Sequence, residues 1–177
     1  MGDSIIRVDR SILPSYPRFL LRQPIVMPEF ETTGPSEFDL ADIEPWIHPE
    51  QKRVPVVAQT IWNVLADTGA LRRCLNLRDG EEIQKKGLEL YREFFAGRSL
   101  FLWKSIMINR HTRQLRIPYL FEYNAETEHA RLVIAWLATT QHLAGTNNPI
   151  AHFPQQEGQE DFPCDTTLWK LFPSRAQ

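Results

Sequence analysis

Cysteine is scarce in this sequence: the 177 residues include only two, Cys74 and Cys164. Two cysteines cannot form the disulfide framework of a small secreted protein, so a reducing compartment is expected. Long hydrophobic runs are also lacking, because the longest apolar stretch, residues 132–137, is far shorter than the roughly 20 residues that cross a bilayer. The opening MGDSIIRVDR has no apolar segment typical of a signal peptide. We therefore expect a cytoplasmic protein that makes no use of a membrane.

Motifs for common catalytic and cofactor chemistry are missing too. The chain has no glycine-rich loop of the kind that cradles phosphates. Its 5 histidines show neither three- nor four-residue spacing, which gives a zinc site little support. Ser36, in the sequence GPSEF, does not fit a nucleophile elbow. We expect no cofactor, no resident metal and no catalytic residue.

Proline is concentrated at the start of the chain. The first 55 residues hold eight of the 13 prolines. Because proline fixes φ and removes a hydrogen-bond donor, long helices and strands cannot run through this segment. Its apolar residues give it enough surface to cover a core, so we predict a wrapping arm over residues 1–55.

Helical periodicity begins after the arm. The spacing of apolar residues predicts a first helix over residues 56–67. A second helix is predicted to begin at Asn76, where Asp79 three residues later resembles a capping box, and to end at Gly97. Gly87 lies inside this second helix, where glycine costs about 1 kcal/mol relative to alanine.

Three β-rich runs follow, separated by two short polar connectors that are typical of hairpins. In the middle run, residues 114–123, apolar side chains alternate with mostly polar ones, which predicts a strand with one apolar face. Pro118 falls in this run, where it would remove a hydrogen bond from a central strand. Either the sheet is bulged beside Pro118, or the strand order differs from a simple meander.

These elements predict an α+β fold in which two helices pack on an antiparallel sheet of three or more strands. We expect a single domain over residues 1–140, composed of the arm, a helical pair at 56–97 and a sheet at 99–137. Residues 141–177 are predicted to form an extended tail with a short apolar docking turn at 166–172. That turn could dock on its own domain or on a partner, and the sequence leaves both open.

Charge is distributed unevenly along a chain of net charge −2. Residues 29–50 carry seven carboxylates and no lysine or arginine, whereas the remainder is mildly basic. The favoured interpretation is a solvated acidic face that complements the basic body. The alternative is a divalent-metal site, because carboxylate oxygens and imidazole nitrogens are suitable ligands, although their spacing matches no ligand motif. The residues of this alternative acidic site are Glu37, Asp39, Asp42 and His48.

Positive charge gathers at the first predicted hairpin of the sheet. Arg110, His111 and Arg113 lie at its tip, with Arg116 and Lys104 on the adjoining strands. A basic hairpin with aromatic neighbours can follow a phosphate backbone, which indicates nucleic-acid binding. The simpler interpretation is a solvated surface, since isolated surface charges are common.

Two groups of residues resemble a family of small uncharacterised bacterial proteins. They are GPSEFDL at 34–40 followed by WIH at 46–48 and Gln51, and LWKS at 102–105 followed by PYL at 118–120. The resemblance covers residues 5–150 and implies a single-domain, intracellular protein of bacterial or mobile-element origin. It implies no activity, cofactor or site residue.

The leading functional hypothesis is a small, non-catalytic interaction module that binds a protein or a nucleic acid. It rests on the uneven charge, the apolar tail and the failure of each catalytic motif to fit. The alternative is a small metal-dependent hydrolase or nuclease that uses the acidic segment 37–48. The identity of a partner and the oligomeric state stay open at this point.

Overall fold

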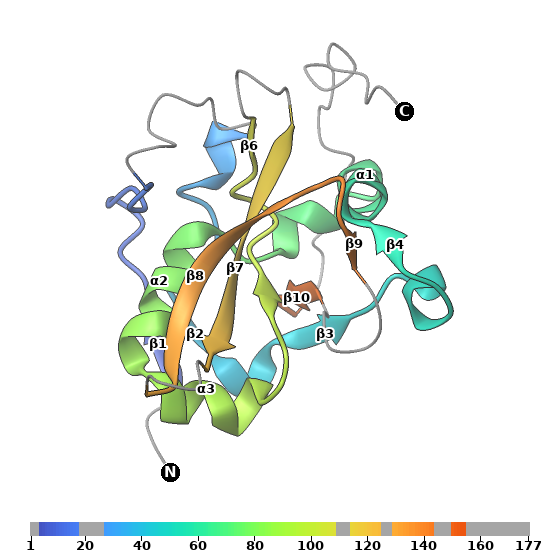
Figure 1. Cartoon of the computed structure of the whole chain (residues 1–177). Coiled ribbons are helices and arrows are strands. Elements are labelled where there is room, and N and C mark those ends of the chain that lie inside the picture. Colours follow the sequence, from blue (N-terminus) through green and yellow to red (C-terminus); the bar gives the residue numbers. More distant parts are fainter. Residues whose placement is uncertain (1–3, 18–26, 109–113, 125–128, 144–149, 155–177) are drawn as a thin grey trace.

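The structure is a computed structural model, and it describes residues 4–17, 27–108, 114–124, 129–143 and 150–154. Within these residues, three α-helices combine with largely antiparallel sheets, which confirms the mixed α+β class (Figure 1). The helices are α1 (Ala58–Asp67), α2 (Leu77–Lys86) and α3 (Leu88–Phe95). Short 3-10 helices are η1 (Pro28–Phe30), η2 (Leu40–Asp42), η3 (Pro49–Lys52) and η4 (Ala70–Arg73).

The largest sheet has six strands and draws on distant parts of the chain. Its first five strands lie in the order β3, β10, β5, β7 and β6, and β8 pairs with β7. β10 runs parallel to β5, so the sheet departs from the purely antiparallel arrangement that the sequence predicted. The strands are β3 (Glu44–Trp46), β5 (Leu100–Phe101), β6 (Met107–Ile108), β7 (Leu115–Tyr123), β8 (Arg131–Ala138) and β10 (Ile150–His152).

Two small antiparallel sheets of two strands each accompany this large sheet. In one, β1 (Ile5–Arg7) pairs with β2 (Glu37–Asp39), so the proline-rich arm closes on itself. In the other, β4 (Val56–Val57) pairs with β9 (His142–Leu143). β9 and β10 come from the segment that was predicted as an extended tail, and the predicted apolar turn at 166–172 lies outside the described residues.

The sheet is interrupted opposite Pro118, which decides between the two alternatives that the sequence left open. The first β-rich run is split into β5 and β6, and residues 102–106 between them face only residues 117 and 118 of β7. Pro118 lies opposite Trp136 on β8, at a position where an antiparallel ladder makes no hydrogen bond. The proline therefore costs the β7–β8 ladder nothing. On its other side its carbonyl accepts the Leu102 N–H, and the Leu102 carbonyl accepts the Ser105 N–H within the bulge, so a bulged meander accommodates the missing donor.

Gly87 separates α2 from α3 and corrects the prediction of one continuous helix. Its φ of +98° is a conformation that side chains rarely adopt, so the helix that begins after Asn76 ends there and a new one starts at once. The predicted capping box is confirmed. The Asn76 side chain accepts a hydrogen bond from the Asp79 N–H, and the Asp79 carboxylate accepts one from the Asn76 N–H.

Two hydrophobic clusters lie on opposite faces of the large sheet. One packs α1 and η4 against Ile117, and the other packs α2, α3, β1 and β2 against Leu120. Because successive residues of a strand point to opposite faces, the odd-numbered residues of β7 face the first cluster and the even-numbered ones face the second. Figure 1 shows β7 and β8 across the front of the molecule, with α1 near one end of the pair and α3 near the other.

Candidate functional site

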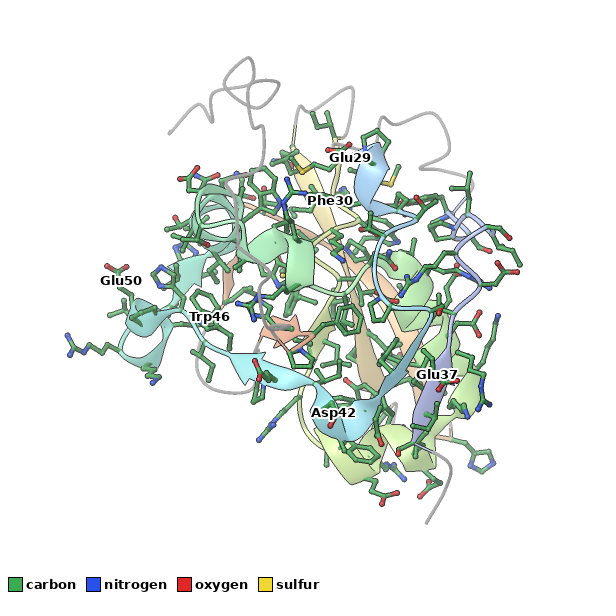
Figure 2. All side chains as sticks on the ribbon, turned by 180° about the vertical axis from the view of Figure 1, so that it is seen from behind. Glu29, Phe30, Glu37, Asp42, Trp46 and Glu50 are labelled. Atoms are coloured by element: carbon green, nitrogen blue, oxygen red, sulfur yellow. The ribbon has the colours of Figure 1, made fainter. Side chains whose placement is uncertain are left out.

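The acidic segment is spread along the surface of the arm. Figure 2 shows Glu37, Asp42 and Glu50 at separate positions along this segment. Glu37 forms an exposed ion pair with Arg7 of the adjoining strand, with 2.8 Å between Arg7 Nε and Glu37 Oε2. Asp42 is exposed at the end of η2. These carboxylates are solvated or paired locally, as the first of the two interpretations requires.

Asp39 and His48, the other two residues of the alternative acidic site, serve as local caps. Asp39 Oδ1 accepts the backbone N–H of Ala41 at 2.9 Å and caps η2. His48 Nδ1 accepts the backbone N–H of Glu50 at 3.3 Å and caps η3. Over the part of the chain that the structure describes, no group of three histidine, cysteine, aspartate or glutamate residues is placed to hold a metal ion.

The predicted basic surface contains fewer described residues than expected. Arg110, His111 and Arg113 lie outside the described residues, and Arg116 is half-buried. Lys104 belongs to the bulge opposite Pro118, and only 1% of it is exposed. Its ammonium therefore cannot meet a phosphate at the surface in this conformation, which removes Lys104 from the predicted patch.

A buried polar cluster holds the arm against the start of α2. Asn76 Nδ2 donates to three backbone carbonyls at 3.1 Å each, those of Phe30, Glu31 and Thr33. On the other side, the Ser105 hydroxyl accepts the Leu77 N–H at 2.7 Å. The first turn of α2 is thereby satisfied by the arm and by the bulge together.

Charged groups surround this helix start. Arg10 of the arm donates through Nη2 to Asp79 Oδ1 at 2.6 Å and to the Pro35 carbonyl at 2.5 Å. The Asp79 side chain is completely buried, and this burial raises the pKa of its carboxyl, although Arg10 and Lys104 oppose the shift. A buried carboxylate needs such partners, so this pair fixes the arm in place.

Glu31 and Lys104 carry buried polar atoms without a hydrogen-bond partner among the described residues. Burial raises the pKa of the Glu31 carboxyl to about 7, against the nearby hydroxyls of Tyr16 and Ser105, which lower it. Burial lowers the pKa of the Lys104 ammonium to about 8, against the attraction of Asp79. Perturbed pKa values often mark functional sites. Here each residue is only 1% exposed, so a solute cannot reach either group and the cluster acts as an anchor for the arm.

A row of aromatic side chains lies on the odd-numbered face of β7 and runs from the core to the surface. The rings of Phe101 and Tyr119 stack with centroids 5.3 Å apart, and those of Tyr119 and Phe121 stack at 5.1 Å. Tyr123 continues the row with an edge-to-face contact at 6.4 Å. On the neighbouring strand, the Arg131 guanidinium lies 5.5 Å from the centroid of the Tyr123 ring.

The cluster around α1 covers only one end of this face. Leu115 and Ile117 are buried in that cluster, and Tyr119 packs against it, whereas Phe121 belongs to neither core cluster. Tyr123 is 39% exposed. We call the part of this face that the described core clusters do not bury the aromatic face, and it consists of Tyr119, Phe121, Tyr123, Arg131, Val133 and Ala135.

The outer edge of β8 adjoins the aromatic face. The bond from the Thr139 N–H to the Leu115 carbonyl sets the ladder, so the even-numbered residues of β8 direct their backbone groups away from β7. The Leu132 carbonyl accepts the Gln84 side chain at 2.9 Å. Within the described residues, no strand pairs with this edge. An unpaired edge can accept an added strand.

Sequence patterning identified the alternating strand but not which part of its face stays uncovered, because that depends on where α1 packs. The structure contains no helix among the described residues that is long and apolar enough to span a bilayer. Comparison with protein families, with curated proteins and with solved structures finds no match for this chain, so a functional conclusion rests on the geometry described above.

Proposed function

We propose that this protein is a non-catalytic module that binds another protein through the aromatic face. The observation that carries the proposal is the position of Phe121, a large, half-buried apolar side chain near the centre of the face that belongs to neither core cluster of the described residues. Surface patches of contiguous apolar side chains mark binding sites more often than isolated ones do. Phe121 lies between Tyr119 and Tyr123 and opposite Val133, so the patch is contiguous.

The composition of the aromatic face fits a protein partner. Tyrosine and arginine are the residue types that dominate the energetics of protein interfaces, and phenylalanine is enriched there. Arg131 lies against the Tyr123 ring and places one charged residue at the rim of an otherwise apolar surface. An apolar centre with a polar rim is the usual anatomy of such an interface.

The adjoining edge of β8 favours an extended segment of the partner. The even-numbered residues Ile134 and Trp136 direct backbone groups outward, where a partner strand would find donors and acceptors in register. Side chains of such a strand would continue the row of Phe121 and Val133 across the sheet. Main-chain hydrogen bonds would then supply affinity, and the aromatic face would supply selectivity.

A nucleic acid is the less suitable ligand for this surface. Binding to a phosphate backbone depends on several lysine or arginine contacts, and its affinity falls steeply with salt. Arg131 is the one charged residue that the register of β7 and β8 assigns to the described aromatic face. Lys104, which was expected to add to a basic surface, is buried.

The test is an affinity capture from a bacterial lysate with matched variants, performed with and without nuclease. The double variant Phe121→Thr/Tyr123→Thr removes the two rings and replaces them with β-branched residues, which are favourable in strands. Val54→Thr is the control, because Val54 is an exposed apolar residue in another segment, 54% exposed. We expect a captured protein that the nuclease leaves in place, that the control retains and that the double variant loses.

Three outcomes would contradict the proposal. Capture that disappears after nuclease treatment would indicate a nucleic-acid ligand. Equal capture by the double variant and the control would place the binding surface elsewhere. An absence of any specific captured protein with the unaltered chain would leave the aromatic face without the proposed role. Circular dichroism of each variant checks that the fold is retained.

A further inference from the structure

A small apolar pocket lies on the other side of the molecule from the α1 cluster. Its volume is about 110 Å³, and η2, the segment before β3, the end of α3, β5 and β10 contribute to its walls. Five of its lining residues belong to the cluster on the even-numbered face of β7, and Phe94 packs against that cluster; the five are Leu40, Ile43, Phe95, Leu100 and Ala151. The lining residues are Leu40, Ala41, Ile43, Pro45, Phe94, Phe95, Arg98, Leu100 and Ala151.

Arg98 is the one charged residue in the described lining, and the local backbone fixes its position. Its N–H donates to the Phe95 carbonyl at 2.9 Å, and its carbonyl accepts the Tyr91 hydroxyl at 2.7 Å. Gly97, with a φ of +71°, makes the turn that places Arg98 beside the pocket after α3 ends. The backbone N–H and the backbone carbonyl of Arg98 are therefore both hydrogen-bonded, which fixes the main chain at this residue.

The Arg98 guanidinium has no ion-pair partner within the described part of the chain, unlike that of Arg92, six residues earlier. Arg92 donates to both Glu89 and Glu122, at 3.0 and 2.6 Å. Arg98 is exposed and lines the pocket, whose other lining residues are apolar and include no carboxylate. An unpaired guanidinium presents donors in a fork that matches the two oxygens of a carboxylate.

The volume limits what the pocket can hold. Ligand sites for cofactors and nucleotides occupy roughly 300–1,000 Å³, so this pocket is too small for them. An apolar cavity of about 150 Å³ accepts benzene, so a pocket of about 110 Å³ accepts one branched aliphatic group. The apolar walls favour such a group, because burying it removes apolar surface from water.

We propose that this pocket binds a free, short, branched aliphatic monocarboxylate, whose hydrocarbon part enters the hollow and whose carboxylate meets Arg98. The volume of the pocket limits the size of the ligand's hydrocarbon part, and the positive charge of Arg98 in the lining favours a negatively charged polar group on the ligand. This ligand site is separate from the aromatic face, which lies on the opposite face of the sheet. Either proposal can hold without the other.

The test uses protein-observed NMR titration of the full chain with 3-methylbutanoate as the probe. The uncharged amide of the same acid measures the contribution of the carboxylate, and acetate measures that of the hydrocarbon. We expect shifts at the amides of Leu100 and Ala151, with dissociation in the range of about 0.1–1 mM. The amide should bind about tenfold more weakly, since a charge-assisted bond is lost.

Two variants give the contrast that decides the proposal. Arg98→Gln should weaken binding of 3-methylbutanoate about tenfold, whereas Arg53→Gln, at an exposed arginine away from the pocket, should leave it unchanged. Equal binding of the acid and its amide, equal binding by the Arg98→Gln variant, or no binding at about 10 mM would overturn the proposal. Tighter binding of a peptide ending in leucine than of the free acid would overturn it as well, in favour of a polypeptide C-terminus.

Discussion

Arg10 and Asp79, which are 69 positions apart in the sequence, form an ion pair of 2.6 Å in which the Asp79 carboxylate is completely buried. The pair joins the proline-rich arm to the capping box of α2, because Asp79 also accepts the Asn76 N–H. Gly34 lies close to the same guanidinium, where a Cβ would come within 2.9 Å of Arg10 Nη2. Arg10 therefore holds the arm in two ways: its guanidinium pairs with Asp79 of α2, and the same guanidinium lies close to Gly34 further along the arm.

Arg10→Ala should lower the free energy of unfolding by about 3–5 kcal/mol, because it leaves a buried carboxylate without its cation. The loss is measured by urea denaturation of the full chain at neutral pH. Arg7→Ala is the matched control, since the Arg7–Glu37 pair is 71% and 55% exposed at its two side chains. Its cost should be about 0–1 kcal/mol. Similar losses for the two variants would show that the contribution of Arg10 to stability does not come from its ion pair with the buried Asp79 carboxylate.

Local patterns in the sequence predicted local structure well. The alternation of residues 114–123 predicted the long strand β7, and the spacing of Asn76 and Asp79 predicted the capping box. Both signals arise from contacts within a few residues, so they are visible without knowledge of the fold. The doubt about Pro118 also pointed to a real feature, the bulge of residues 102–106.

Contacts between distant residues could not be read in the same way. Lys104 was assigned to the basic surface because it lies on a strand beside the basic hairpin, yet the bulge carries it into the core near Asp79 and Phe153. Gly87 was placed inside a helix because a glycine alone does not reveal a φ of +98°. The pairing of β3 and β10 joins residues that are 104 to 108 positions apart, and neither strand has a sequence pattern that identifies its partner.

Glu31 should make stability depend on pH. Its carboxyl pKa is raised from 4.5 to about 7, so the folded state binds more protons than the unfolded state between these values. Stability contributed by this group is therefore lost as the pH rises from about 4.5 through about 7. Glu31→Gln removes the titrating group, and its free energy of unfolding should exceed that of the unaltered chain by up to about 3 kcal/mol at pH 8.

The measurement is urea denaturation of both proteins at a series of pH values from 5 to 8. Tyr16, Ser105, Asp79 and Glu81 face Glu31, and they are common to both proteins, so the difference between the curves reports on Glu31 itself. Glu29→Gln is the control, because Glu29 is an exposed carboxylate of η1 (Figure 2), and Glu31 is the residue that follows this 3-10 helix. A difference between the unaltered chain and Glu31→Gln that stays constant from pH 5 to pH 8 would contradict this prediction.

Gly80 occupies a helical position where alanine would normally be better by about 1 kcal/mol. A Cβ at Gly80 would lie 2.5 Å from Leu102 Cδ1, and Leu102 belongs to the fully buried bulge beside Lys104. Gly80→Ala should therefore overpack this contact and lower the free energy of unfolding by about 1–3 kcal/mol. The measurement is urea denaturation, repeated in a Leu102→Ala background that removes the obstructing methyl groups.

In that background, Gly80→Ala should become neutral or stabilising, because the helix gains alanine and the cavity left by Leu102 accepts the added methyl group. Leu102→Ala alone should cost about 2–5 kcal/mol. The coupling between the two substitutions should then be about 1–3 kcal/mol, as expected for residues in direct contact. Equal costs of Gly80→Ala in both backgrounds would mean that α2 and the bulge do not pack as closely as the Gly80–Leu102 distance requires.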